Sequence, residues 1–222
     1  GRSALLVKGA RRVGKSTLVE QFAKHEYKSY ILLDFNRIKP EINELFSDLS
    51  DLDFFFMRLQ SETNVTLHER QSVIVFDEVQ KQPLARQGIK YFVQDGRYDF
   101  IETGSLLTLK KNVKNIVIPS EETRLTLHPM DLDEFLWATG KDSVPDFLRK
   151  FYEMQKPLGS THRSFMREMR LYMLVGGMPQ AVDAYINSHN MQSVDEVKRE
   201  IVQLYDDEFR KIDPSGRASR LF

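Results

Sequence analysis

The chain of 222 residues contains no cysteine, and this absence excludes two kinds of site. Without thiols it forms neither disulfide bonds nor zinc–thiolate centres, and a reducing compartment is plausible. The five histidines lack the spacing of metal ligands, so we predict no zinc site. The sequence also lacks a signal peptide and any apolar run long enough to span a bilayer. We therefore expect no membrane partner and a cytoplasmic location.

The sequence also has no excess of positive or negative charge, because 32 basic residues balance 32 acidic ones. No net field steers the chain toward nucleic acid, so contact with DNA would need a local basic patch. An Asn-Lys-x-Asp guanine-reading motif is absent as well, which disfavours a GTPase and leaves adenine as the default base. The length suffices for one α/β domain with a sizeable core and a smaller appendage.

The strongest functional signal lies at residues 9–16, where Gly9-Ala10-Arg11-Arg12-Val13-Gly14-Lys15-Ser16 fits G-x-x-x-x-G-K-[ST] at every fixed position. In such a loop the backbone N–H groups cradle phosphates, and the start of the following helix adds positive potential. Average amino-acid usage gives such a match in a chain of this length about one time in a hundred. The flanks agree, because residues 4–7 predict a buried strand and residues 17–23 predict a helix.

We therefore predict that this loop and the helix start bind the phosphates of ATP. Lys15 is placed to reach the β- and γ-phosphates, and the Ser16 hydroxyl is placed to hold Mg²⁺. The predicted nucleotide-binding residues are Gly9, Ala10, Arg11, Arg12, Val13, Gly14, Lys15, Ser16 and Thr17.

A second signal is a pair of acids after the apolar residues 73–76, which predict a buried strand. Neighbouring side chains on a strand point to opposite faces, so the two acids would have different duties. We assign Asp77 to the Mg²⁺ and Glu78 to general-base activation of the attacking water, the division of labour in P-loop ATPases. An exposed turn is the alternative for such a pair taken alone, and the phosphate loop upstream favours catalysis.

Two hydroxyl side chains end the strand expected at residues 98–102, which runs into Thr103-Gly104-Ser105. Thr103 or Ser105 could sense the γ-phosphate or orient the attacking water, with a hydroxyl-capped turn as the alternative for each. Glu102 is unusual in a strand that should be buried. We expect it to pair with Lys15 or to face a polar crevice.

Strands and helices alternate along the first part of the chain, with strands expected near residues 3–8, 29–34, 73–77, 98–102 and 124–127. This alternation predicts an α/β fold with a mainly parallel sheet, helices on both faces, and ligands at the carboxyl ends of the strands. We expect Phe54 and Phe55 in the core. Ser193 to Glu196 should form a capping box that starts the last helix.

Five motifs occur in a fixed order, and together they resemble one family. After the phosphate loop come Asp77-Glu78-Val79-Gln80, Thr103-Gly104-Ser105-Leu106-Leu107, His128-Pro129-Met130 with Asp133-Glu134-Phe135-Leu136, and Val175-Gly176-Gly177-Met178-Pro179-Gln180-Ala181-Val182. The series is similar to the bacterial and archaeal AAA-type ATPases, near the STAND signalling ATPases, that carry a trailing domain of unknown function with a nuclease-like fold.

This resemblance implies the three-layer sandwich of a P-loop NTPase, with a five-stranded sheet in the order 5-1-4-3-2 and a helical or winged-helix lid. We expect the ATPase core over residues 1–130, the lid over 131–213, and a linker over 214–222 toward a further domain.

The function that we favour is a Mg²⁺-dependent ATPase that couples turnover to movement of the lid and the trailing domain. The alternatives are a slowly hydrolysing STAND-like switch that serves as a scaffold, and a DNA-remodelling motor, which the neutral net charge does not support. A homo-oligomer or a protein partner is compatible with each of them. An arginine from the lid or from a neighbouring subunit would stabilise the transferred phosphoryl group. The candidates, each otherwise a surface charge, are Arg124, Arg163, Arg167, Arg170 and Arg210.

Overall fold

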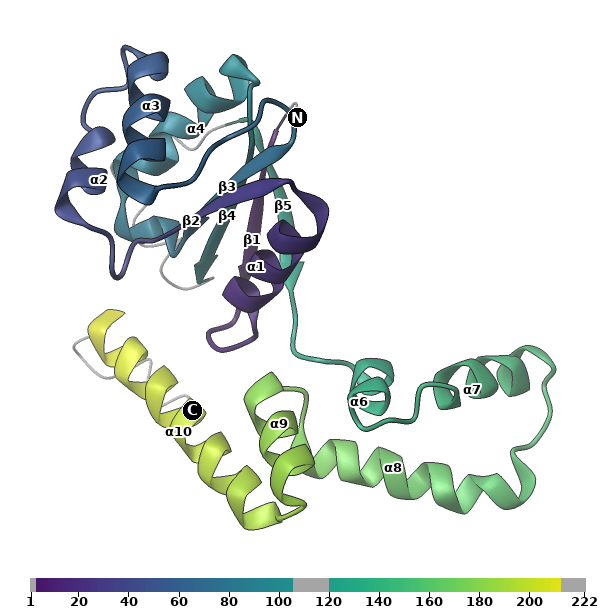
Figure 1. Ribbon diagram of the computed structural model, residues 1–222. Helices are drawn as coiled ribbons and strands as arrows, with labels where there is room; N and C mark the ends of the chain where they lie inside the picture. Colours follow the sequence, from purple (N-terminus) through teal and green to yellow (C-terminus); the bar gives the residue numbers. More distant parts are fainter. Residues whose placement is uncertain (1–2, 106–119, 213–222) are drawn as a thin grey trace. The chain divides into compact units, whose positions relative to one another are not determined.

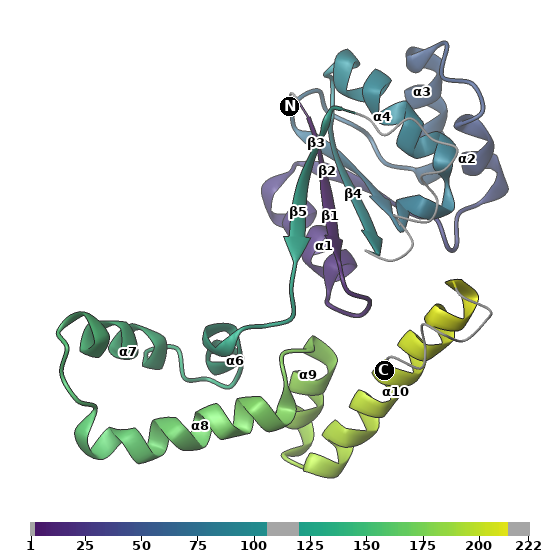
Figure 2. The ribbon, with the colours of Figure 1, turned by 180° about the vertical axis from the view of Figure 1, so that it is seen from behind.

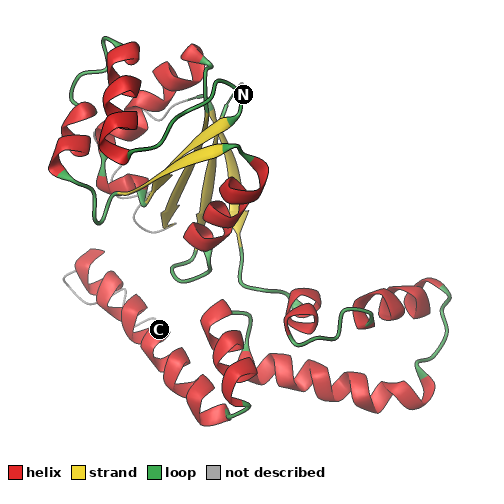
Figure 3. Cartoon of the chain, viewed as in Figure 1, coloured by secondary structure: helices red, strands yellow, loops and turns green. Residues whose placement is uncertain are grey.

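The computed structural model describes residues 3–105 and 120–212, with side chains through Arg210. Contacts divide the chain into two compact units, which meet in sequence between Leu127 and His128. In the described residues, the strands all belong to the first unit and the second unit contains helices (Figure 3). We describe each unit by itself, as the nucleotide unit and the helical unit.

The nucleotide unit is built on a parallel sheet with the order β2-β3-β4-β1-β5. This order is 5-1-4-3-2 read from the other edge, so the predicted topology is confirmed. The central strand β3 is buried along its whole length, as its apolar sequence predicts. The strands are β1 (Ala4–Gly9), β2 (Ser29–Asp34), β3 (Ser72–Asp77), β4 (Asp99–Ser105) and β5 (Glu122–Leu127).

Helices cover both faces of this sheet, as Figures 1 and 2 show from opposite sides. Helix α1 packs Val19 and Ala23 against one face, where they meet valines and isoleucine of β1, β3 and β4. The other face carries α2, α3 and α4 and the larger core cluster. The helical segments of this unit are α1 (Lys15–Glu26), α2 (Pro40–Leu45), α3 (Leu52–Thr63), the 3₁₀ turn η1 (Val79–Lys81) and α4 (Pro83–Asp95).

Aromatic rings fill the larger core cluster. Phe92 of α4 stacks on Phe100 of β4 with ring centroids 5.0 Å apart, and Phe55 of α3 lies 5.1 Å from Phe92. Phe76 of β3 contacts both Phe92 and Phe100. These rings join four elements, α3, β3, α4 and β4, so they fix the two helices against the sheet.

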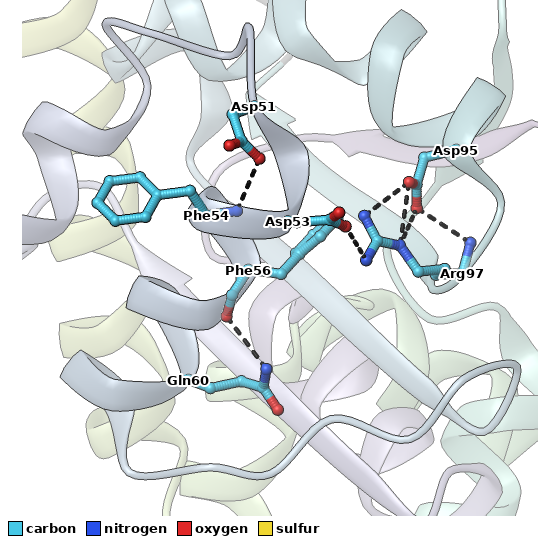
Figure 4. Close-up of polar contacts among 7 residues, drawn as sticks. All are labelled: Asp51, Asp53, Phe54, Phe56, Gln60, Asp95 and Arg97. Atoms are coloured by element: carbon cyan, nitrogen blue, oxygen red, sulfur yellow. Dashed lines mark hydrogen bonds and ion pairs between the residues drawn. The ribbon is translucent and has the colours of Figure 1, made fainter.

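The start of α3 decides which of its aromatic residues enter this core. The Phe54 N–H donates to Asp51 Oδ1 at 2.9 Å, which caps the helix (Figure 4). With this start, Phe55 points inward and is 2 % exposed, whereas Phe54 is 51 % exposed. Our expectation of a core position is therefore right for Phe55 and wrong for Phe54, because adjacent helical residues lie about 100° apart.

Arg97 ties α3 to the segment that leads into β4 (Figure 4). Its guanidinium pairs with Asp53 at 2.6 Å and with Asp95 at 2.8 Å, and it lies 5.0 Å from the centre of the Phe56 ring. These carboxylates raise the pKa of Arg97. The cluster lies at the amino end of β4, so it stabilises the end of the sheet opposite the strands' carboxyl ends.

The helical unit is organised by a small apolar core around Phe135, Val175, Val182 and Val194. Its described residues form helices and no strand. Phe135 is fully buried, whereas Trp137 is 49 % exposed. Its helical segments are α6 (Leu132–Ala138), α7 (Val144–Glu153), η3 (Gly159–Thr161), α8 (His162–Val175), α9 (Pro179–Ser188) and α10 (Met191–Ile212).

Two of the motifs that carried the family resemblance interlock in this unit. The Met130 N–H donates to the Gly177 carbonyl oxygen at 2.7 Å, and the Tyr172 hydroxyl donates to the Met130 carbonyl oxygen at 2.9 Å. A Cβ atom on Gly177 would lie 2.1 Å from that same oxygen. Glycine is thus required at 177 because two backbone segments meet there.

The helix caps in this unit differ from our expectation. Helix α10 begins at Met191, so Ser193 lies inside it and the predicted capping box there is wrong. The Asn190 side chain instead accepts the Gln192 N–H at 2.9 Å, which satisfies an N–H at the helix start. A capping box does form, between Asp131 and Glu134 at the start of α6.

Candidate nucleotide site

Three of the predicted motifs lie at the carboxyl ends of adjacent strands. The phosphate loop follows β1, the two acids end β3, and Thr103 to Ser105 end β4, which lies between β1 and β3. Ser105 is in register with Gly9. The sheet order therefore collects segments from three distant parts of the sequence at one edge.

The phosphate loop is shaped by two left-handed residues and one close approach. Arg12 has φ 59° and Gly14 has φ 92°, so the peptide planes curl into a concave turn before α1. A Cβ atom on Gly9 would lie 2.4 Å from the Leu127 carbonyl oxygen of β5, and Val13 is buried beneath the loop. The N–H groups of such a curled loop, next to the start of a helix, favour a bound anion.

Lys15 turns its side chain back into this loop. It is 5 % exposed, and its Nζ donates to the carbonyl oxygens of Ala10 at 2.8 Å and Gly9 at 3.4 Å. The positive charge is thus held on the concave side of the turn. An ammonium group in this position suits a phosphate oxygen.

Ser16 and Asp77 meet directly, although 61 positions separate them. The Ser16 hydroxyl, in the first turn of α1, donates to Asp77 Oδ1 at 2.8 Å. Asp77 is the last residue of β3 and is 7 % exposed. A hydroxyl and a carboxylate are oxygen ligands of the kind that Mg²⁺ takes, usually with several waters. The residues present therefore fit a magnesium ion bound with a triphosphate.

Glu78 leaves the strand rather than continuing it. Its backbone is left-handed, with φ 58° and ψ 46°, and 3₁₀ turn η1 follows at once. The two acids thus point differently because the chain turns at Glu78, rather than because of strand alternation. The Glu78 carboxylate accepts a hydrogen bond from the Gln80 side-chain amide, and Gln80 is itself buried. No feature of the sequence pattern indicated this contact.

Both hydroxyl candidates at the end of β4 are buried, and they have different surroundings. The Thr103 hydroxyl donates to Asp77 Oδ1 and accepts the Glu78 N–H at 3.1 Å. Ser105 lies two residues on, beside Gly9 in the sheet. A fully buried Thr103 therefore contacts the two acids themselves.

Glu102 is fully buried, and neither of its carboxylate oxygens accepts a hydrogen bond. Burial, together with the nearby negative charge of Glu122, raises its pKa well above the usual range, and Arg86 opposes this only partly. The Arg86 guanidinium donates to both carboxylate oxygens of Glu122, with N–O distances of 2.9 and 3.1 Å. The expected pairing of Glu102 with Lys15 is wrong, because neither carboxylate oxygen has a hydrogen-bond partner.

The arginine candidates remain unranked. All five are exposed side chains; Arg124 lies 3.7 Å from Glu122, and Arg210 pairs with Asp206 at 2.9 Å. In the described part of the chain, no group of three or more His, Cys, Asp or Glu side chains forms a metal cluster. Nor does that part contain a helix with the length and apolarity needed to cross a membrane.

A family model described as an AAA domain matches residues 1–136, more than half of the chain. The chain belongs to the AAA domain family. Membership of this family supports an ATP-binding function of the ATPase type. AAA ATPases in general bind ATP together with Mg²⁺, in agreement with the oxygen ligands that Ser16 and Asp77 bring together.

Solved structures give a more distant comparison for this AAA domain. A structure of C. elegans PCH-2 is similar with a TM-score of 0.46 and 12% sequence identity, over 88% of this chain and 61% of that one. The match thus spans less than two thirds of the PCH-2 chain, and the fold assignment stands on the strand order instead. No curated protein matches the sequence.

Proposed function

We propose that this AAA domain hydrolyses ATP with Mg²⁺ and couples turnover to movement of its helical unit and of any domain that follows. The observation that carries the proposal is the hydrogen bond of 2.8 Å between Ser16 and Asp77. It joins the helix after the phosphate loop to the strand that ends in the acids. Lys15 in the same helix turn and Glu78 beside Asp77 then lie around one site.

Each residue has a distinct part in the proposed reaction. The loop N–H groups and Lys15 bind the β- and γ-phosphates and reduce the repulsion that an incoming nucleophile meets. Ser16 and Asp77 would hold Mg²⁺, which would supply positive charge to the phosphate groups. The Glu78 carboxylate accepts a proton from the water whose oxygen bonds to the γ-phosphorus, while the bond from that phosphorus to the β–γ bridging oxygen breaks and ADP leaves.

Replacement of Glu78 by Gln tests this assignment. Glu78→Gln keeps the size and polarity of the side chain and removes the base, so ATP affinity should stay within about threefold and turnover should fall by roughly a hundredfold or more. Steady-state phosphate release and titration calorimetry measure the two quantities. The exposed Glu41→Gln serves as a matched control. Turnover of Glu78→Gln at the wild-type rate would remove Glu78 from the base role.

A slowly hydrolysing nucleotide switch is the second candidate, and the contact between Gln80 and Glu78 favours it. A carboxylate held by an amide N–H must leave that hydrogen bond before it can accept a proton from the attacking water, so wild-type turnover would be slow until a partner separates the two side chains. Under this alternative, Gln80→Ala should raise the single-turnover rate by about tenfold. Under the ATPase proposal, the same change should leave that rate unchanged or lower it.

Oligomeric state, partners and location stay predictions. Turnover measured at several protein concentrations would reveal a contribution from a second subunit, including an arginine supplied across an interface. The same assay with and without DNA would test the remodelling alternative, which no contact in the described residues favours. The cytoplasmic location expected from the sequence is likewise a prediction.

A further inference from the structure

Thr103 makes two hydrogen bonds with its hydroxyl, both inside the protein. The O–H donates to Asp77 Oδ1, and the oxygen accepts the Glu78 backbone N–H at 3.1 Å. Thr103 is 0% exposed. A hydroxyl has a single proton, and here that proton is given to Asp77. It is therefore not available to donate to a phosphate oxygen in this conformation.

The bond to Asp77 fixes the orientation of the carboxylate. Oδ1 accepts from both Thr103 and Ser16, which belong to different elements on either side of it. Neither of these two hydroxyl groups donates to Oδ2. The two hydroxyl groups therefore determine which carboxylate oxygen is left for a cation.

The bond to Glu78 fixes the backbone of the other acid. Glu78 has φ 58°, a left-handed conformation that is uncommon for a residue with a side chain. The Thr103 oxygen compensates by accepting the N–H that points into the protein at this turn. One side chain of β4 thus determines the direction in which the Glu78 side chain leaves the main chain.

Ser105 provides the comparison within the same strand. It lies two residues beyond Thr103 and is in register with Gly9, so it is next to the start of the phosphate loop. Thr103 is in register with Val7, which lies two residues before Gly9 and so farther from the loop. The two hydroxyls therefore have different neighbours, acids in one case and the loop in the other.

We propose that Thr103 is a positioning residue that joins the magnesium carboxylate of Asp77 to the backbone of the general base Glu78, and that it does not sense the γ-phosphate. The inference rests on the proposed function, because it takes Asp77 as a magnesium ligand. The Thr103 hydroxyl thus sets the position of the magnesium ligand relative to the general base.

The test compares Thr103→Val, which keeps the shape and removes the hydroxyl, with Thr103→Ser, which keeps the hydroxyl. Titration calorimetry on the whole chain measures affinity for ATP and for ADP, each in EDTA and in MgCl₂. For Thr103→Val we expect ATP affinity in EDTA within about threefold of wild type and the gain in affinity from Mg²⁺ reduced by about tenfold. The preference for ATP over ADP should be unchanged, and Thr103→Ser should behave as wild type.

Two results would overturn the inference. One is a Thr103→Val variant that keeps the full gain in affinity from Mg²⁺. The other is a variant that loses its preference for ATP over ADP, as removal of a γ-phosphate sensor would cause. Should Thr103→Val fail to fold by circular dichroism, Thr103→Ala provides the same measurements.

These readouts separate the inference from the proposed function, because binding is measured without turnover. A wild-type chain that binds Mg²⁺ and ATP but does not hydrolyse ATP would defeat the proposed function, and the Thr103 comparison would still be decided. A wild-type chain without affinity for ATP would overturn both.

Discussion

The two units of this chain differ in the polar groups that they bury and the apolar groups that they leave exposed. At the carboxyl edge of its sheet, the nucleotide unit buries Lys15, Asp77 and Thr103, and each of them has hydrogen-bond partners. The helical unit leaves large apolar side chains exposed, among them Tyr152 at 85 % and Met173 at 70 %. Buried polar groups that all find partners specify one arrangement, whereas a small apolar core specifies less. The chemistry is therefore placed where the fold is most strongly determined.

The largest expected effect falls on the nucleotide unit alone. Lys15→Ala removes the ammonium held inside the phosphate loop, and ATP affinity should fall by roughly a hundredfold or more, about 3 kcal/mol. Titration calorimetry measures the affinity, and Lys24→Ala is the matched control, because Lys24 lies on the same helix and its side chain is 42% exposed. Unchanged ATP affinity in Lys15→Ala would refute the phosphate site and the contrast built on it.

A smaller effect should appear in the helical unit. Gly177→Ala places a methyl group against the Met130 carbonyl oxygen, and this overpacking should cost about 1–3 kcal/mol of unfolding free energy. Urea unfolding followed by circular dichroism measures the loss. Gly159→Ala is the control, since a Cβ there meets nothing within 4 Å and only its left-handed backbone is strained. An unchanged free energy of unfolding in Gly177→Ala would mean that the contact between Met130 and Gly177 does not organise this unit.

A further effect concerns Glu102 and depends on pH. Below the unfolded-state pKa the carboxyl is protonated in both states, so its contribution to stability is fully present. Because the folded pKa is raised, the unfolded chain releases the proton first as pH increases. Stability should then fall by about 1.4 kcal/mol per pH unit until the folded pKa is reached.

Glu102→Gln does not titrate, so its stability relative to wild type should increase with pH over that window. Urea unfolding at pH 5, 6, 7 and 8 gives the comparison, and the exposed Glu41→Gln should show no such trend. The charged groups near Glu102 are Arg86 and Glu122, and their bidentate pair should persist in the variant. Parallel stability curves for Glu102→Gln and wild type would contradict a buried neutral carboxyl.

The sequence allowed the sheet and the edge that carries the site to be predicted, because both depend on local patterns. Apolar runs located the strands, and the phosphate-loop motif placed Lys15 and Ser16 at the start of a helix. The family resemblance and the parallel topology together predicted that Asp77 and Ser16 lie at one metal site.

The parts that escaped prediction depend on contacts between distant side chains. Nothing local indicates that Thr103 bonds two acids or that Glu102 lies near Arg86 and Glu122. The misplaced capping box has a different cause, because the local pattern fits more than one position. Ser193 fits the pattern as well as Asp131 does, and Asn190 starts the last helix instead.

The close approach between Gly9 and Leu127 has a mechanical consequence. Leu127 is the last residue of the nucleotide unit, and its carbonyl oxygen occupies the space that a side chain on Gly9 would need. Gly9 and Leu127 are also partners in the sheet, so a larger residue at position 9 would have to push β5 away from β1. The start of the phosphate loop and the end of β5 are thus in direct backbone contact, with no side chain between them.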